Sequence, residues 1–255
     1  MCTVIVLRRP NHAWPLILAG NRDEMRDRPW TAPGRHWPDR PEIIAGRDDL
    51  AGGSWLGLND SGVVAVMLNR KGTLGPQAGK RSRGELVLEA LDHADAADAA
   101  RALADLNPDA YRAFNMIIAD NRDAFWLRHA GTEPMNAIPL DEGLSMITAF
   151  DANDTADPRI AANLQHFRAA PPPDPTAPDG WEAWTALQGR GADTNAPAAT
   201  AGLCFALDSG FATVNATQIA LPAPAVDGPA SVMRFADGPP DRTPFRPVPL
   251  GAEQR

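Results

Sequence analysis

Residues 2–24 read CTVIVLRRPNHAWPLILAGNRDE, and this stretch decides the fold. Segment 2–8 is β-branched and apolar, the Pro-Asn pair at 10–11 is typical of a turn, and 14–20 is apolar again. Two such runs around a short turn predict a pair of adjacent strands that starts at the first residue after the initiator methionine. Cys2 is therefore expected to be held in a sheet, not on a loose terminal tail.

Beyond residue 24, strand patterns alternate with helical ones. Segment 53–69 is interrupted by the turn Asn59-Asp60-Ser61-Gly62, a second hairpin signature. Apolar or β-branched runs predict further strands at 43–46, 113–119, 124–128, 144–149, 203–207, 211–221 and 231–235. Helices are expected after a capping box at 82–85, at 95–106, from Asn107-Pro108, from Asp157-Pro158 and at 181–187.

This order of strands, helices, strands, helix and strands favours an α+β fold in which antiparallel sheets are covered by helices. We expect one domain over residues 1–255, with the recognisable motifs in the half at 2–150. Segment 171–200 is rich in Pro, Ala and Gly, which indicates a surface excursion of that domain and not a linker.

Bulk composition excludes several functions. A net charge of -8 repels phosphate backbones, so a nucleic-acid partner is not expected. No apolar run has the length of a membrane span, and the N-terminus lacks the pattern of a signal peptide, so a cytoplasmic location is expected. Two cysteines and five scattered histidines give no metal-ligand spacing, so no metal site is expected. The oligomeric state cannot be read from these features.

Cys2 carries chemistry of its own. Removal of Met1 is expected because cysteine is a small second residue, and it would leave a free α-amine on the carbon that bears the thiol. The amine titrates near about 8 and the thiol near about 8.5, so the amine can serve as the general base for its own sulfur. The alternative is a small apolar residue on a frayed terminus, which the immediate start of a strand disfavours.

Two further features bear on this site. The quartet Asn21-Arg22-Asp23-Glu24 follows the second strand without a gap, so it lies near Cys2 if the two strands pair. There a carboxylate would hold the α-ammonium and an arginine would lower the thiol pKa. Asn69-Arg70 ends a strand, where an amide donor would stabilise an oxyanion. The alternatives are a solvated turn with a surface ion pair and an asparagine that caps a turn.

These residues resemble the NRDE family, whose eukaryotic member is called transport and Golgi organisation protein 2. The shared pattern runs in order along the first half of the chain. It comprises Met1-Cys2-Thr3, Gly20 to Glu24, Gly46-Arg47-Asp48, Ala51 to Gly57, Asn69, Ser82 to Val87, Phe114-Asn115 and Asp120.

The family is similar to the N-terminal nucleophile hydrolases, and within them to penicillin acylases and bile salt hydrolases, which use a freed cysteine to cleave amides. The resemblance implies a four-layer αββα sandwich. It also implies the roles of the site residues: Cys2 as nucleophile, Asp23 bound to its amine, Arg22 tuning the thiol and Asn69 donating to the oxyanion. Asn21, Trp30 and Arg70 are expected to contact the substrate, although Trp30 alternatively covers the sheet.

The chain departs from the hydrolase pattern at three places. Asn21 stands where the hydrolases have arginine, and Arg22 follows one position later. Segment 148–150 is Thr-Ala-Phe where eukaryotic relatives have Ser-Asn, so a second oxyanion asparagine is missing unless Asn153 replaces it. Segment 212–214 is Ala-Thr-Val where relatives have Gly-Thr-Arg, so a substrate-binding arginine is also missing.

Two functions therefore compete. One is an amidohydrolase that cleaves a carbon–nitrogen bond, other than a peptide bond, of a small-molecule amide through Cys2, without a cofactor. The other is a non-catalytic binding and trafficking protein on the same scaffold, for a hydrophobic ligand such as haem, a lipid or acyl-CoA, which the resemblance implies for eukaryotic relatives. In that case His36 or the Cys2 thiolate would ligate haem iron, although a surface loop position is the plainer interpretation of His36.

Overall fold

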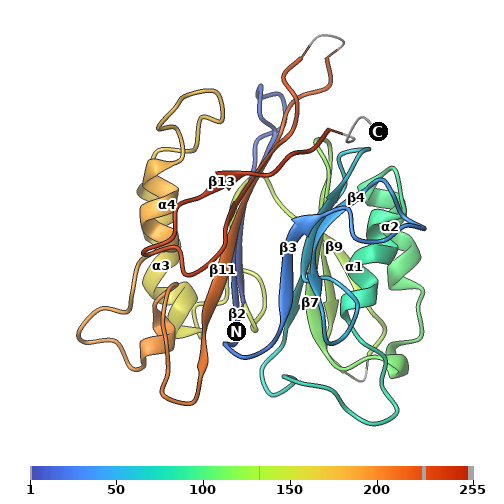
Figure 1. The fold of residues 1–255 in the computed structure, drawn as a ribbon, viewed down its shortest axis with the longest axis horizontal. Coiled ribbons are helices and arrows are strands. Elements are labelled where there is room, and N and C mark those ends of the chain that lie inside the picture. Colours follow the sequence, from blue (N-terminus) through green and yellow to red (C-terminus); the bar gives the residue numbers. More distant parts are fainter. Residues whose placement is uncertain (1, 132, 226–227, 252–255) are drawn as a thin grey trace.

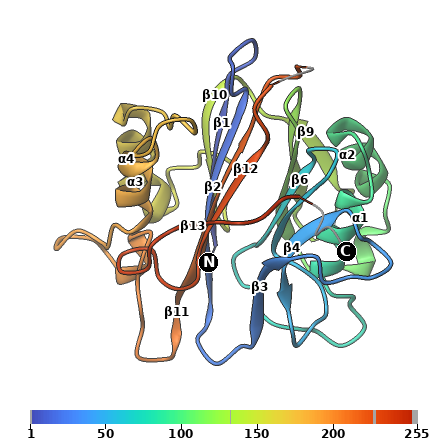
Figure 2. The same ribbon diagram turned by 45° about the horizontal axis from the view of Figure 1, so that its top comes forward.

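The structure, a computed structural model, describes residues 2–131, 133–225 and 228–251. Two antiparallel sheets pack face to face, and helices cover the outer face of each (Figure 1). The view turned by 45° shows the same layers, with α3 and α4 on one side and α1 and α2 on the other (Figure 2). The expected α+β class and the four-layer αββα arrangement are confirmed.

The first sheet has six strands in the order β10-β1-β2-β11-β12-β13. Their bounds are β1 Thr3–Arg8, β2 Leu16–Met25, β10 Gly143–Ile147, β11 Phe211–Leu221, β12 Val232–Ala236 and β13 Arg246–Pro247. Strand β1 lies between β10 and β2 and is buried on both faces, which is why its residues 4–7 are continuously apolar and do not alternate.

The second sheet has seven strands in sequential order from β3 to β9. Their bounds are β3 Trp30–Gly34, β4 Ile43–Asp48, β5 Leu56–Asn59, β6 Val64–Asn69, β7 Phe114–Ala119, β8 Ala124–His129 and β9 Asn136–Pro139. Hairpins join β5 to β6 and β7 to β8, as the turn signals at 59–62 and 120–122 predict, whereas α1 and α2 lie between β6 and β7 in the chain.

The helices are short. They are α1 Gly84–Leu91, α2 Ala96–Ala104, α3 Pro158–Ala169 and α4 Glu182–Gln188, with 3-10 turns at Pro108–Ala110 and Ala199–Ala201. Asp95 caps α2 and Asp157 caps α3 through side-chain bonds to backbone N–H groups. None of the helices in the described ranges is long and apolar enough to cross a membrane.

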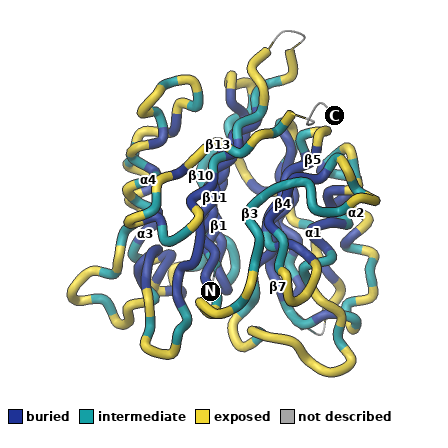
Figure 3. The backbone as a smooth tube through the Cα atoms, in the orientation of Figure 1, coloured by how far each residue is buried: buried dark blue, intermediate teal, exposed yellow. Residues whose placement is uncertain are grey.

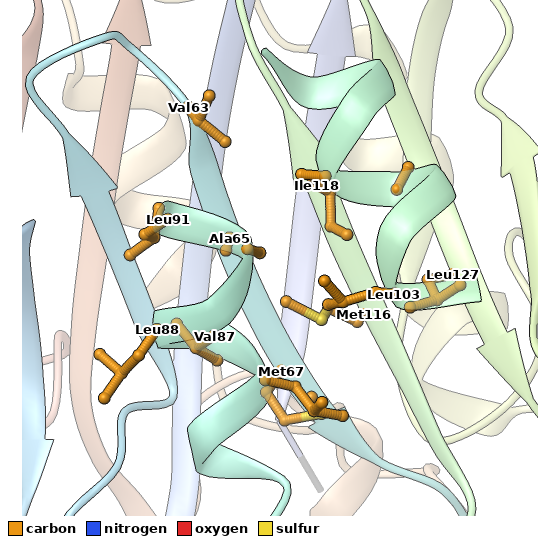
Figure 4. Close-up of a cluster of buried hydrophobic side chains, with 14 of the residues drawn as sticks. Val63, Ala65, Met67, Val87, Leu88, Leu91, Leu103, Met116, Ile118 and Leu127 are labelled. Carbon is orange, nitrogen blue, oxygen red and sulfur yellow. The ribbon is translucent and has the colours of Figure 1, made fainter. Parts of the chain in front are cut away.

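Three apolar clusters fill the three spaces between the four layers, and the burial map shows the sheets as the buried centre of the molecule (Figure 3). One lies between the second sheet and α1 and α2, where Met67 and Leu88 are among the side chains drawn in Figure 4. Another lies between the sheets, and the last between the first sheet and α3 and α4. Each sheet is therefore packed on both faces, which fixes strand register at the site.

The structure corrects several local predictions. The 21–24 quartet lies inside β2 and does not follow it. Two strands were not predicted: β3, in the Pro- and Trp-rich segment after the quartet, and β9, which carries too few apolar residues to be recognised. Segment 203–207 is not a strand and has only an isolated bridge between Ala206 and Ala212. The capping box at 82–85 does not form, because the Glu85 side chain accepts a hydrogen bond from Tyr111 Oη instead.

Candidate active site

Cys2 lies directly before β1 and lines a cavity of about 430 Å³ between the two sheets. Thr3 pairs with Asn21 in β2, so the register puts Cys2 opposite Arg22. The thiol is half-buried and donates weakly to the backbone oxygen of Asp23, 3.8 Å away. Burial raises the pKa of this thiol, the carboxylate of Asp23 raises it further, and the positive charge of Arg22 lowers it.

Because side chains alternate along a strand, the quartet in β2 divides between two faces. Arg22 faces the other sheet, and its guanidinium carbon lies 4.2 Å from the centre of the Trp55 ring. The same group contacts Asp48 Oδ2 at 3.4 Å. Arg22 and Glu24 line the cavity with Cys2, whereas Asn21 and Asp23 face α3 and α4.

The Asp23 carboxylate is part of a buried network. One oxygen accepts from Arg159 Nη1 at 2.6 Å and the other accepts from Thr213 Oγ1 at 2.8 Å. Arg159 Nη1 also donates to Thr3 Oγ1 at 2.9 Å, beside Cys2. The side chains of Arg159 and Asp23 are 1% and 0% exposed, so this is a fully desolvated ion pair. It ties α3 to the first residues of β1 and to β2.

Asn69 is the last residue of β6 and lines the same cavity as Cys2. Its side-chain amide makes no hydrogen bond to any described residue, so it is free to donate to a ligand. Arg70 does not line the cavity, since its guanidinium is held by Asn115 Oδ1 at 2.7 Å and by Asp151 Oδ1 at 2.7 Å.

The other expected substrate contacts are occupied elsewhere. Both Nδ2 protons of Asn21 go to backbone oxygens, those of Gln188 and Leu203, and Oδ1 accepts from Gln188 Nε2. Asn21 thereby anchors the stretch from α4 to 203 on the outer face of the first sheet. Trp30 packs edge-on against Trp55 and Phe235 and lines a different hollow, so it supports the Arg22–Trp55 stack from behind.

His36 is not placed to ligate the iron of a haem bound in the Cys2 cavity. His36 does not line the Cys2 cavity, and its Nε2 lies 2.8 Å from the backbone oxygen of Ala32. Within the described ranges, no cluster of three or more His, Cys, Asp or Glu side chains suits a metal ion. Asn153 does not replace the missing oxyanion asparagine, because it does not line the Cys2 cavity and its Oδ1 accepts from Met146 N at 2.8 Å.

Sequence reasoning missed Asn215, which lies next to Arg22 in the register and lines a small cavity shared with Cys2. It also missed three basic residues, two in the β6–α1 loop and one shortly before β7. Lys80, Arg83 and Arg112 all line the Cys2 cavity, and none of them pairs with a carboxylate of a described residue. Arg159 and Thr213 were missed because their link to Asp23 spans more than 130 residues of sequence.

Comparison with solved structures defines the class of fold. The Caenorhabditis elegans ortholog of N-acylethanolamine-hydrolyzing acid amidase matches with a TM-score of 0.60 at 13% identity, covering 97% of this chain and 100% of that one. Penicillin V acylase from Agrobacterium tumefaciens gives 0.53 at 14%, covering 92% and 83%. A C2A mutant of conjugated bile acid hydrolase from Clostridium perfringens gives 0.52 at 11%, covering 99% and 98%. The fold is that of the N-terminal nucleophile hydrolases.

Sequence comparison then identifies the family. The model of "Transport and Golgi organisation 2" matches residues 1–162, and the chain belongs to this family, as its motifs indicate. The Homo sapiens homolog of Transport and Golgi organization protein 2 is 36% identical over 115 residues, and the Bos taurus homolog is 35% identical over 116. Each alignment covers 43% of this chain and 40% of the relative, less than half of either protein.

Proposed function

We propose that this protein is an amidase that hydrolyses a carbon–nitrogen bond of a small molecule through Cys2, once Met1 has been removed. The observation that carries the proposal is the placement of one thiol, one amide donor and one guanidinium on a single cavity. Cys2 lies directly before β1, Asn69 ends β6 and Arg22 lies within β2, and all three line it.

The chemistry needs only these groups and water. The thiol sulfur of Cys2 attacks the substrate carbonyl carbon while its proton passes to the α-amine of the same residue. Asn69 Nδ2 donates to the oxyanion of the tetrahedral intermediate. The α-ammonium then gives the proton to the departing nitrogen, the carbon–nitrogen bond breaks, and a thioester remains. A water molecule, deprotonated by the amine, attacks the thioester, which releases a carboxylic acid and restores the thiol.

Arg22 stabilises the reactive form of the nucleophile. Its positive charge lowers the pKa of the Cys2 thiol, opposing the effect of burial. The stack on Trp55 and the contact to Asp48 hold the guanidinium in place without neutralising it completely. Asp23 acts from the other face of β2, where its ion pair with Arg159 fixes the strand ends that meet at Cys2.

Charge points to the class of substrate. The protein carries a net charge of -8, yet the cavity is lined by six cationic side chains and two carboxylates, those of Glu24 and Asp48. Asp48 pairs with Arg22 and Arg28, and Arg81 pairs with Glu85. The three remaining cations are Lys80 and Arg83 in the β6–α1 loop and Arg112 shortly before β7. An amide that also carries an anionic group would satisfy both sides of the cavity.

Burial of positive charge costs free energy within the group formed by Lys80, Arg83 and Arg112. Burial and the nearby positive charge of Arg112 lower the pKa of the Arg83 guanidinium to about 10. Arg83 and Arg112 both donate to backbone oxygens, such as those of Thr73 and Gly72, which hold the loop but do not cancel charge. A bound anion would relieve this repulsion. The alternative of a non-catalytic carrier of acyl-CoA or lipid would use the same cavity, and turnover separates the two functions.

The test is a hydrolysis assay on N-acyl derivatives of 4-aminobenzoic acid with acyl chains of several lengths, each compared with its neutral methyl ester. The proposal predicts release of the aminobenzoate by the mature protein and none by Cys2→Ala. Cys204→Ser is the matched control, because Cys204 lies outside the cavity. Binding without release in the wild type would favour the carrier, and equal rates in the wild type and Cys2→Ala would refute the amidase.

A further inference from the structure

Asn215 is a buried polar side chain without a partner. It is 0% exposed, and neither Oδ1 nor Nδ2 has a hydrogen-bond partner among the described residues. Buried amide groups are nearly always paired, since an unpaired donor or acceptor loses its bonds to water and gains nothing in return. Two such atoms on one side chain, next to a candidate active site, call for an explanation.

A β-bulge aims this side chain at the site. Thr213 pairs with Asp23 and Asn215 pairs with Arg22, so Val214 is the extra residue between them. Without the bulge Val214 would stand opposite Arg22, and Asn215 would point to the other face, toward the helices. The inserted residue turns Asn215 to the inner face of the sheet, in one row with Arg22 and Cys2. Bulges beside active sites commonly re-aim a side chain in this way.

The row encloses a small cavity of about 10 Å³, lined by Cys2, Arg22 and Asn215 together with apolar side chains of the other sheet. This is about the space that the centre of one water molecule needs. Cys2 and Asn215 are two strands apart, about 10 Å between backbones, which is too far for direct contact and suitable for a bridge. Arg22 Nη1, between them, is also buried and lacks a partner among the described residues.

We propose that Asn215 is a positioning residue whose amide holds one water molecule against Arg22 Nη1, and so keeps the guanidinium directed at the Cys2 thiol. The water satisfies three polar atoms that otherwise have no partner. Asn215 acts through Arg22 and the water and does not contact the substrate. The catalytic purpose of this arrangement rests on the proposed function. Its effect on the pKa of the Cys2 thiol can be measured without turnover.

The test is the pH dependence of Cys2 alkylation by iodoacetamide, followed by mass spectrometry of the N-terminal peptide. Asn215→Leu keeps the size of the side chain and removes both amide atoms. We expect an upward shift of the apparent thiol pKa by about one pH unit, which lowers the alkylation rate near neutral pH about tenfold. Asn215→Ser, which keeps a hydroxyl beside the cavity, should restore part of the rate. Ile219→Val, on the same strand, is the control for a generic core change and should leave the profile unchanged.

An Asn215→Leu profile that coincides with the wild type would overturn the proposal, as would a high-resolution crystal structure with the cavity dry. A melting curve of each variant separates loss of folding from the effect on the thiol, because a folded Asn215→Leu protein with an unshifted profile still overturns the proposal. If the wild type hydrolyses no amide but the pKa shift is seen, the amidase proposal fails and the positioning role stands. If hydrolysis is found without the shift, the reverse holds.

Discussion

Breaking the ion pair between Asp23 and Arg159 should be among the most damaging changes away from the cavity. Arg159→Met leaves the Asp23 carboxylate buried, with the hydrogen bond from Thr213 but without the cation 2.6 Å away. Removing one partner of a buried pair costs about 3–5 kcal/mol in the free energy of unfolding. For a chain of 255 residues this corresponds to a fall of about 6–20 °C in the melting temperature.

The assay is urea and thermal unfolding followed by circular dichroism, in a double-mutant cycle with Asp23→Leu. The double variant removes both charges together, so it should be more stable than either single variant. Arg101→Met is the control, because its pair with Asp98 is 71% and 62% exposed and should contribute little. Single variants that lose less than about 1 kcal/mol, or a cycle without coupling, would refute the claim that this pair fixes the site.

Four other predictions follow from the geometry. Asn69→Ala should lower kcat on an amide substrate by about 10²–10³ with little change in melting temperature, because its amide is free in the described structure; an unchanged kcat would exclude it from the oxyanion site. Gly46→Ala should lower activity more than stability, since the new methyl would lie 2.3 Å from the Trp55 ring that carries Arg22, and steady-state kinetics beside a melting curve checks this. Negatively charged sulfonatoethyl methanethiosulfonate should modify Cys2 faster than its trimethylammonium counterpart, when both rates are divided by the rates with free cysteine. Lys80→Gln should reduce this preference about two- to fivefold at low salt. The control Arg101→Gln should leave the preference unchanged. Burial raises the pKa of the Cys204 thiol to about 11, so peptide-resolved alkylation at Cys204 should be very slow at pH 7 and rise about tenfold per pH unit toward that value; rapid labelling at pH 7 would contradict the burial.

The sequence allowed much of the scaffold to be predicted because its signals are local. The apolar runs that flank the turn at 10–11 lie next to each other in the chain, and β1 and β2 pair as those runs predict. The same holds for the hairpin around 59–62 and for the helix that begins after Asp157. Strands β3 and β9 escaped prediction because they contain proline and few buried apolar residues, so pairing with a neighbour creates them and not their own composition.

At the site, position was predictable and direction was not. Cys2, Arg22 and Asn69 do share one cavity, but the quartet lies within β2, so alternate residues face opposite layers. Asn21 therefore bonds to α4 and Asp23 bonds to α3. The sequence alone does not show to which layer each residue points. Asn215 depends on a bulge in β11, and a bulge leaves no recognisable mark in the segment Ala212 to Ala216. Residue type was enough to predict where these residues lie, whereas the face to which each side chain points depends on long-range strand register.

The central claim is that Cys2 is a nucleophile on a free N-terminus, and one mass measurement tests it most directly. The purified protein is mixed with an N-acyl aminobenzoate, quenched in acid within the first turnovers, and its N-terminal peptide is analysed. We expect a peptide that begins at Cys2 and carries the acyl group as a thioester, which Cys2→Ala abolishes. A peptide that retains Met1, or an unmodified Cys2 while aminobenzoate is being released, would contradict it.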